Sequence, residues 1–337
     1  MVIAIKKEAS KESLNALISY LDSCGVNVDF QNLAEYDLLT VTGAVYKIDV
    51  ERVRAFDVVE RVKRITEPFI LASRKFCETD TVIKVCGRKI GGNNFTVIAG
   101  PCAVESEKSI IETAIAVKKA GADFLRGGAF KPRTSPYSFQ GLKEDGIKFL
   151  LKAKRETGLP LVSEITSEKS ADLFYDVDVV QIGARNMQNY ALIREIAKMK
   201  KPVLLKRGTM ASVEELLMSA EYLLSEGAKD VILCERGIKT FEPVTRSSLD
   251  LSSLPALKEI THLPVIADPS HAAGYRRFVA PLSYAAAAVG AKGLMIEVSD
   301  NHESALSDGA QAVSSNELKE IILNVKKIQK LLYKPEN

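Results

Sequence analysis

Residues 95–128 read FTVIAGPCAVESEKSIIETAIAVKKAGADFLRGG, and this segment decides the fold. Its first and last parts, FTVIAG and DFLRGG, are short apolar runs of the kind that form strands buried on both faces of a parallel sheet. Between them, EKSIIETAIAVKKAG is amphipathic and favours a helix. The segment therefore predicts a strand, a helix and a second strand parallel to the first.

The same alternation continues toward the C-terminus. Further strands are predicted at LVSEI, VVQIG, PVLLKRG, VILCERG, LPVIADPS and GLMIEV, with amphipathic or alanine-rich stretches such as SVEELLMSAEYLLSEG among the connections. Eight strand–helix units over roughly 240 residues match the size of a (β/α)8 TIM barrel. A doubly wound open sheet is the competing fold. We favour a closed barrel over residues 95–337, because there are eight strands and no GxGxxG at the first turn.

The N-terminal residues 1–65 predict a separate small domain. Strands are expected at VIAIKK, NVDFQNL, DLLTVTGAV and VVERVKRI, with helices at KESLNALISYLDSCG and around VERVRAF. This β-α-β-β-α-β order is that of the ferredoxin-like fold. Residues 66–94 are interpreted as a linker that includes a hairpin at KVCGRKIGG.

The composition excludes several classes of protein. The chain has 337 residues, 46% of them apolar and 26% charged, which is ordinary for a globular protein with a full core. Its net charge of only +3 argues against nucleic-acid binding. No stretch resembles a signal peptide or a membrane span. An odd number of scattered cysteines argues against a disulfide framework and for a reducing cytoplasm, and we interpret four of them as core residues: Cys24, Cys77, Cys86 and Cys234.

Polar residues gather at the C-terminal ends of the predicted barrel strands. In a TIM barrel this end carries the active site. On closure, strands 7, 8 and 1 become neighbours, and a thiol, an imidazole and two carboxylates would then lie together. Such a mixed donor set suits a divalent metal ion, with manganese, iron, zinc and cobalt all open. The predicted ligands are Cys102, His271, Glu297 and Asp308.

The other strand ends carry cations. So many positive charges at one rim would repel one another unless an anion binds there, and Arg and Lys both suit phosphate and carboxylate groups. The cations that strands 2, 4, 5 and 6 supply are Arg126, Lys131, Arg133, Arg185, Lys206 and Arg236. Two interpretations remain open for Glu164 and Glu235: they serve in acid–base catalysis, or they neutralise neighbouring arginines. Arg207 is expected to point away from the mouth, because successive strand residues face opposite sides.

Several of these motifs occur together in one enzyme family. The segments AGPCAVES, RGGAFKPRTSPYSFQG, QIGARN, PVLLKRG, ILCERGI, DPSHAAG and SDGAQ resemble 3-deoxy-D-arabino-heptulosonate 7-phosphate (DAHP) synthase of the type I beta group, some members of which carry an N-terminal ferredoxin-like regulatory domain. The resemblance implies condensation of phosphoenolpyruvate with D-erythrose 4-phosphate and water to give DAHP and phosphate. This reaction is the first step of the shikimate pathway to the aromatic amino acids.

The resemblance also implies roles for individual residues. It implies the four metal ligands predicted above, with Cys102 and His271 among the catalytic residues. It assigns Lys131 as a proton donor and Glu164 as one group that could activate water. Substrate-binding residues would be Arg126, Lys131, Arg185, Lys206 and Arg236 for phosphoenolpyruvate, Arg133 and Thr134 for the sugar phosphate, and additionally Glu235 and Asp308.

Alternatives remain open for the enzyme and for its N-terminal part. A related 3-deoxy-octulosonate 8-phosphate synthase would use arabinose 5-phosphate, but that group typically has Ala-Asn at the position of Pro132. A Schiff-base aldolase with Lys206 as nucleophile, or a catalytically silent phosphometabolite sensor, are further possibilities. Residues 1–65 either build an oligomer only or bind tyrosine or phenylalanine as a feedback inhibitor. The resemblance alone implies a homotetramer.

Overall fold

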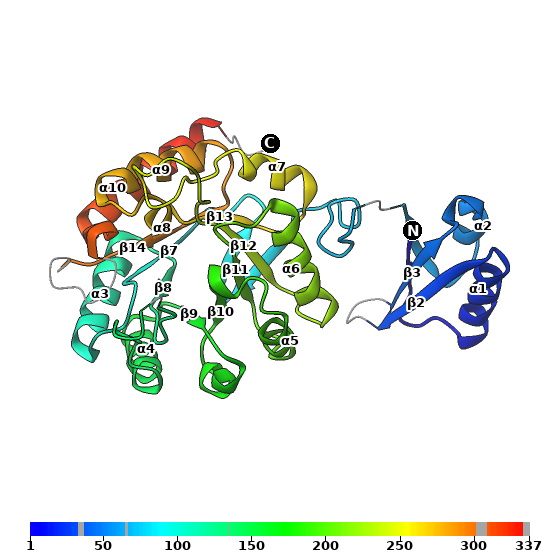
Figure 1. Cartoon of the computed structure of the whole chain (residues 1–337), viewed down its shortest axis with the longest axis horizontal. Helices are drawn as coiled ribbons and strands as arrows, with labels where there is room; N and C mark the ends of the chain where they lie inside the picture. Colours follow the sequence, from blue (N-terminus) through cyan, green and yellow to red (C-terminus); the bar gives the residue numbers. More distant parts are fainter. Residues whose placement is uncertain (33–36, 65–66, 134, 301–308, 333–337) are drawn as a thin grey trace. The chain divides into compact units, whose positions relative to one another are not determined.

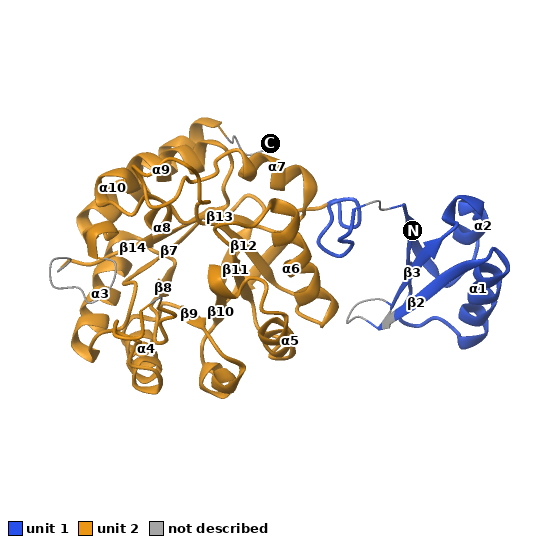
Figure 2. Ribbon diagram, viewed as in Figure 1, with its two compact units in different colours: residues 1–78 blue, residues 79–337 orange. Residues whose placement is uncertain are grey.

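The computed structural model describes residues 1–32, 37–64, 67–133, 135–300 and 309–332. The chain forms two compact units, residues 1–78 and residues 79–337, shown in separate colours in Figure 2. The division falls inside the segment that the sequence predicts as a linker.

The first unit is a four-stranded antiparallel sheet with helices (Figure 1). The strands lie in the order β2-β3-β1-β4, which is the order of a ferredoxin-like fold and confirms the prediction. Its elements are β1 (Val2–Ile5), α1 (Lys11–Ser23), β2 (Val26–Asn32), β3 (Asp37–Gly43), the 3-10 helix η1 (Val45–Lys47), α2 (Val50–Arg54) and β4 (Val59–Lys63).

Local sequence signals explain where the two helices of this unit begin. The Ser10 side chain accepts a hydrogen bond from the Ser13 amide at the start of α1, and Asp49 caps α2 in the same way. Leu17 and Leu21 of α1 are fully buried against Ile3 and other residues of the sheet. The unit thus has a hydrophobic core of its own.

The second unit is a closed barrel of eight parallel strands, in the cyclic order β7 to β14. Pairing of β14 with β7, for example Gly293 with Thr96, closes the sheet and excludes the doubly wound alternative. The strands are β7 (Thr96–Gly100), β8 (Phe124–Arg126), β9 (Leu161–Ile165), β10 (Val179–Ile182), β11 (Val203–Lys206), β12 (Val231–Glu235), β13 (Val265–Ala267) and β14 (Gly293–Glu297).

Helices connect the strands on the outside of the barrel (Figure 1). One connection differs from the predicted alternation, because the 3-10 helix η2 (Glu168–Phe174) replaces an α-helix after β9. Two further 3-10 helices are short: η3 (Ala184–Asn186) follows β10, and η5 (Gly309–Gln311) precedes the last helix. The helices are α3 (Glu107–Ala120), α4 (Glu144–Thr157), α5 (Tyr190–Lys198), α6 (Val213–Ser225), α7 (Ser253–Ile260), α8 (Pro269–Ala273), α9 (Arg276–Ala288) and α10 (Ser315–Leu332).

A hairpin precedes the barrel and packs into its core. It consists of β5 (Val82–Val85) and β6 (Arg88–Gly91), joined by Cys86 and Gly87, whose φ angles of 47° and 78° suit a tight two-residue turn. Ile83 and Ile90 belong to the same core cluster as Ile98 of β7 and residues of the other barrel strands. The segment predicted as a hairpin therefore forms, and it is part of the barrel unit.

The five cysteines all lie in the described part of the chain and are reduced in the structure. Cys234 is fully buried in the barrel core, as predicted, and Cys24 and Cys77 are half-buried. The prediction is wrong for Cys86, which is exposed because it occupies the hairpin turn. Within the described residues, no helix is long and apolar enough to cross a membrane.

Candidate active site

Three predicted metal ligands meet at the C-terminal end of the barrel. Cys102 follows β7, His271 lies on α8 after β13, and Glu297 ends β14. Ligand atoms of the three side chains all lie within 4.8 Å of one another. Cys102 and Glu297 are 5% and 0% exposed, so this donor set is shielded from water. The fourth predicted ligand, Asp308, lies outside the described residues.

Asp268 orients the histidine of this cluster. It is the N-cap of α8 and accepts a hydrogen bond of 3.0 Å from the His271 amide. Its Oδ2 atom lies 2.7 Å from Nδ1 of the His271 ring. The other ring nitrogen, Nε2, is thereby directed at Glu297, 3.0 Å from Oε1. A carboxylate behind a histidine in this way is the usual support of a metal-binding imidazole.

The charges of the cluster depend on one another. Burial disfavours charge on all of these groups, but the carboxylates of Asp268 and Glu297 raise the pKa of His271 to about 9. The pKa values of both carboxyl groups stay well below the usual range despite their burial, because His271 faces each of them. Two buried carboxylates beside a thiol and an imidazole form a site that a divalent cation fits.

A cavity of about 570 Å³ opens beside this cluster. His271 forms part of its lining, so the cavity and the metal-ligand cluster share a side chain. Glu164 is the one acidic residue that lines it within the described part of the chain. Seven cationic side chains surround it: Lys131, Arg133, Arg185, Lys206, Arg236, Lys239 and Arg246.

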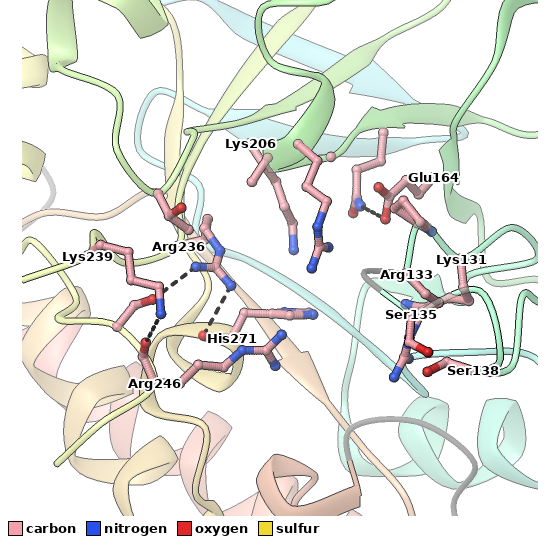
Figure 3. A pocket seen from close by; sticks show the side chains of 17 residues that line it. Lys131, Arg133, Ser135, Ser138, Glu164, Lys206, Arg236, Lys239, Arg246 and His271 are labelled. Atoms are coloured by element: carbon pink, nitrogen blue, oxygen red, sulfur yellow. Dashed lines mark hydrogen bonds between the residues drawn. The ribbon is translucent and has the colours of Figure 1, made fainter. Parts of the chain in front are cut away.

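The cations lie at opposite sides of the cavity. Figure 3 shows Arg236, Lys239 and Arg246 on one side of His271, and Arg133 with its neighbouring serines on the other. Such an arrangement suits two anionic groups held apart from each other, because guanidinium and ammonium groups bind phosphate oxygens through charge-assisted hydrogen bonds.

Lys131 joins the cavity to the metal-ligand cluster. Lys131 lines the cavity, and its Nζ atom donates hydrogen bonds to the Cys102 carbonyl at 3.1 Å and to the Cys102 Sγ atom at 2.9 Å. Burial acts to lower the pKa of this ammonium, but the charges of Cys102 and Glu164 outweigh that effect and raise it. Lys131 therefore carries a proton at the point where the two parts of the site meet.

Glu164 is positioned by residues of the adjacent strand. Gln181 donates a hydrogen bond of 3.2 Å to its Oε2 atom. On the other side, the carboxylate fills the space that a side chain at Gly183 would take, since a Cβ atom there would lie 1.9 Å from Oε1. The glycine of QIGARN thus makes room for the carboxylate in the cavity wall.

Two predicted substrate-binding residues lie elsewhere. Arg126 does not line the cavity; its Nη1 atom donates a 2.7 Å hydrogen bond to Glu297 Oε1. Glu235 is fully buried behind the wall, where it pairs with Arg207 at 2.8 Å. Arg207 also pairs with Asp250, so it points away from the mouth as expected. Arg126, Arg207 and Glu235 thus form ion pairs that stabilise the ends of the strands.

Further residues of the site were not predicted from the sequence, or lie outside the described part of the chain. Thr134, predicted to bind a phosphate group, lies outside the described residues. Asp268 follows β13 directly in the DPSH motif, and this position at a strand end is the signal by which its role could have been predicted. Lys239 and Arg246 come from the long loop between β12 and α7, where no strand pattern indicates which side chains turn inward.

Comparison with known proteins finds family matches in both units. The sequence profile of the DAHP synthetase I family matches residues 77–334, and that of the DAHP synthase ferredoxin-like domain matches residues 1–67. The chain belongs to the DAHP synthetase I family. The matched ranges cover the whole barrel and the whole ferredoxin-like sheet, as well as every described residue of the site.

The chain is similar to two kinds of enzyme, a heptonate aldolase and octonate aldolases. A phospho-2-dehydro-3-deoxyheptonate aldolase of Thermotoga maritima is 42% identical over 329 residues, which cover 97% of each chain. A crystal structure of the Thermotoga maritima DAHP synthase superposes with a TM-score of 0.78 at 41% identity, covering 98% of this chain and 97% of that one. A 2-dehydro-3-deoxyphosphooctonate aldolase of Francisella tularensis is 30% identical and covers 74% of this chain and 97% of its own.

Proposed function

We propose that this protein is a DAHP synthase, which condenses phosphoenolpyruvate with D-erythrose 4-phosphate and water and releases phosphate. The observation that carries the proposal is the cavity with cations at two opposite sides, which shares His271 with the Cys102–His271–Glu297 cluster. Both substrates bear a phosphoryl group, and their reacting carbon atoms must meet between these two sides, beside the cluster.

The two substrates take different sides of the cavity. Arg185, Lys206 and Arg236 hold phosphoenolpyruvate, as the family resemblance implies, and all three line the cavity. Arg133, together with Thr134, holds the phosphate group of the sugar. Arg126 contributes indirectly, through the carboxylate of Glu297.

Cys102, His271 and Glu297, with Asp308, would hold a divalent metal ion, with Mn²⁺, Fe²⁺, Zn²⁺ and Co²⁺ as candidates. When bound, the metal supplies Lewis acidity that polarises the aldehyde carbonyl. Asp268 keeps the Nε2 atom of His271 directed into the cluster.

Lys131 and Glu164 perform the proton transfers in this proposal. The methylene carbon of phosphoenolpyruvate forms a bond to the aldehyde carbon, and Lys131 donates a proton to the alkoxide oxygen that results. Water adds to the central carbon of the former phosphoenolpyruvate, and Glu164 takes a proton from that water. Loss of phosphate from the resulting hemiketal gives the product.

The four-carbon sugar is favoured over arabinose 5-phosphate. Identity to the heptonate enzyme is 42% over 97% of the chain, against 30% over 74% for the octonate enzyme. The loop KPRT also carries Pro132 where the octulosonate group typically has Ala-Asn, and Pro132 lines the cavity next to Arg133. The loop is therefore one residue shorter than the Lys-Ala-Asn-Arg loop of the octulosonate group.

The test is consumption of phosphoenolpyruvate by metal-stripped protein, before and after addition of Mn²⁺, with either sugar phosphate. We expect metal-dependent loss with erythrose 4-phosphate only. Loss with arabinose 5-phosphate would move the assignment to octulosonate 8-phosphate synthesis. Absence of turnover with both sugars, in protein shown to hold metal, would favour the sensor function instead.

We further propose that the first unit binds tyrosine or phenylalanine and that the enzyme is a homotetramer in the cytoplasm. The match of residues 1–67 to the DAHP synthase ferredoxin-like domain supports a role specific to this family. Light scattering of the purified protein measures the assembly, and a mass other than four chains would contradict it.

A further inference from the structure

Gln311 is a buried amide to which the proposed mechanism gives no role. It ends η5 and is 2% exposed. Its Nε2 atom donates a hydrogen bond to Glu297 Oε2, and its Oε1 atom accepts one of 3.1 Å from Arg246 Nη1. One side chain thus contacts both a predicted metal ligand and a cation of the cavity wall.

The two partners fix the orientation of this amide. In the reverse orientation the carbonyl oxygen would face a carboxylate and the NH2 group would face a guanidinium, and both contacts would be repulsive. The backbone is anchored as well: the Val313 amide donates to the Glu297 carbonyl at 3.0 Å. Gln311 is therefore held against Glu297 by its own side chain and by the segment that follows it.

The contact restricts how the Glu297 carboxylate can turn. Oε2 is occupied by Gln311, and Oε1 lies 3.0 Å from His271 Nε2 and 2.7 Å from Arg126 Nη1. Because Gln311 holds one edge of the carboxylate, the other edge stays directed at the cluster. Hydrogen-bond partners of metal ligands typically change metal affinity by about 10-fold to 100-fold when removed.

The other end of the amide reaches the anion-binding cavity. The Arg246 amide donates to the Ala273 carbonyl at 3.2 Å, and the Ser247 amide donates to the Ala272 carbonyl at 2.9 Å. The loop that carries Arg246 is thus joined to α8, the helix that carries His271. A shift of Arg246 toward a bound anion would be transmitted to Glu297 through Gln311.

We infer that Gln311 is a positioning residue that orients Glu297 for metal binding and links it to Arg246 in the cavity wall. The inference rests on the proposed metal-dependent function and deepens it. It predicts that metal affinity responds to Arg246, a residue of the cavity wall, through this one amide.

The experiment measures the dissociation constant of Mn²⁺ for metal-stripped, full-length protein by calorimetric titration. We expect Gln311→Leu to weaken binding by about 10-fold to 100-fold. Gln311→Asn, which keeps the amide but shortens its reach, should weaken it in the same direction. The matched control is Gln329→Leu on α10, whose amide donates to the Ala287 carbonyl away from the site, and it should bind Mn²⁺ as the unmodified protein does.

A double-mutant cycle tests the link itself. Arg246→Leu should weaken Mn²⁺ binding in the unmodified protein but have no further effect in the Gln311→Leu background. Equal effects in both backgrounds would overturn the link, and unchanged affinity in Gln311→Leu and Gln311→Asn would overturn the positioning role. Failure of the unmodified protein to bind Mn²⁺ at all would instead overturn the proposed metal centre, and the inference with it.

Discussion

At the scale of single residues, the site depends on which side of a strand each side chain faces. Lys206 and Arg207 are neighbours in sequence, yet Lys206 lines the cavity and pairs with Asp268, while Arg207 pairs with Glu235 behind the wall. The same alternation turns Arg236 inward beside the buried Glu235. Lys206 and Arg236, which line the cavity, are thus each next in sequence to a charged residue that pairs behind the wall.

Arg207→Met should therefore destabilise the fold. It leaves the fully buried Glu235 carboxylate without its ion-pair partner, and loss of one member of a buried pair costs about 3 kcal/mol or more. Urea unfolding of the barrel unit measures the loss. Arg207→Met combined with Glu235→Leu should recover part of it, because no uncompensated charge remains at that position. An unchanged stability of the single variant, with a raised KM for phosphoenolpyruvate, would instead give this pair a role in substrate binding.

Gly183→Ala should lower kcat by about a hundredfold if Glu164 transfers a proton. The backbone at Gly183, with φ −71° and ψ 161°, accommodates alanine, so the effect arises from the new methyl group. That group would lie 1.9 Å from Glu164 Oε1 and must displace the carboxylate. Steady-state kinetics in the Glu164→Ala background provides the control: Gly183→Ala should have little further effect there. Equal losses in both backgrounds would show that the methyl group acts on something else.

At the scale of elements, the hairpin β5–β6 closes the core of the barrel unit. Ile83 is fully buried among barrel residues, whereas Val82, next to it on the same strand, is 41% exposed. Ile83→Ala should lower the free energy of unfolding of this unit by about 2–5 kcal/mol, through the cavity that it leaves. Val82→Ala is the matched control and should change it by less than about 1 kcal/mol. Calorimetry of the full chain, followed through the barrel transition, measures both; equal effects would contradict a core role for the hairpin.

The sequence predicted the elements better than it predicted the side chains around the cavity. The eight strands were predictable because each is a short apolar run with its polar residue at the end, and Cys102, His271 and Glu297 follow from that pattern once the barrel closes. The apolar pattern of the strands could not show that the Arg126 side chain is directed at Glu297. Arg126 ends a strand of three residues, and such a short strand does not determine which group a long side chain at its end will reach. Arg246 lies in a loop and Gln311 ends the short 3-10 helix η5, and in both places tertiary contacts set the direction of the side chain.

At the scale of the whole molecule, two units with separate cores are joined in one chain. The barrel unit contains every described residue that lines the cavity or belongs to the metal-ligand cluster. The ferredoxin-like unit contributes none of them, so any effect it has on the reaction must come through binding or assembly. The proposed feedback inhibition by tyrosine or phenylalanine would be such an effect.

Removal of residues 1–78 should therefore separate regulation from catalysis. The remaining chain keeps the barrel with its hairpin, and we expect kcat to stay close to the full-length value, since no described side chain of the site is lost. Inhibition by tyrosine or phenylalanine, measured as phosphoenolpyruvate consumption at saturating Mn²⁺, should disappear. If the truncated enzyme remains active and equally inhibited, the effector binds to the barrel. If neither form is inhibited, the first unit serves assembly. Light scattering of both forms would then show a change in the number of chains.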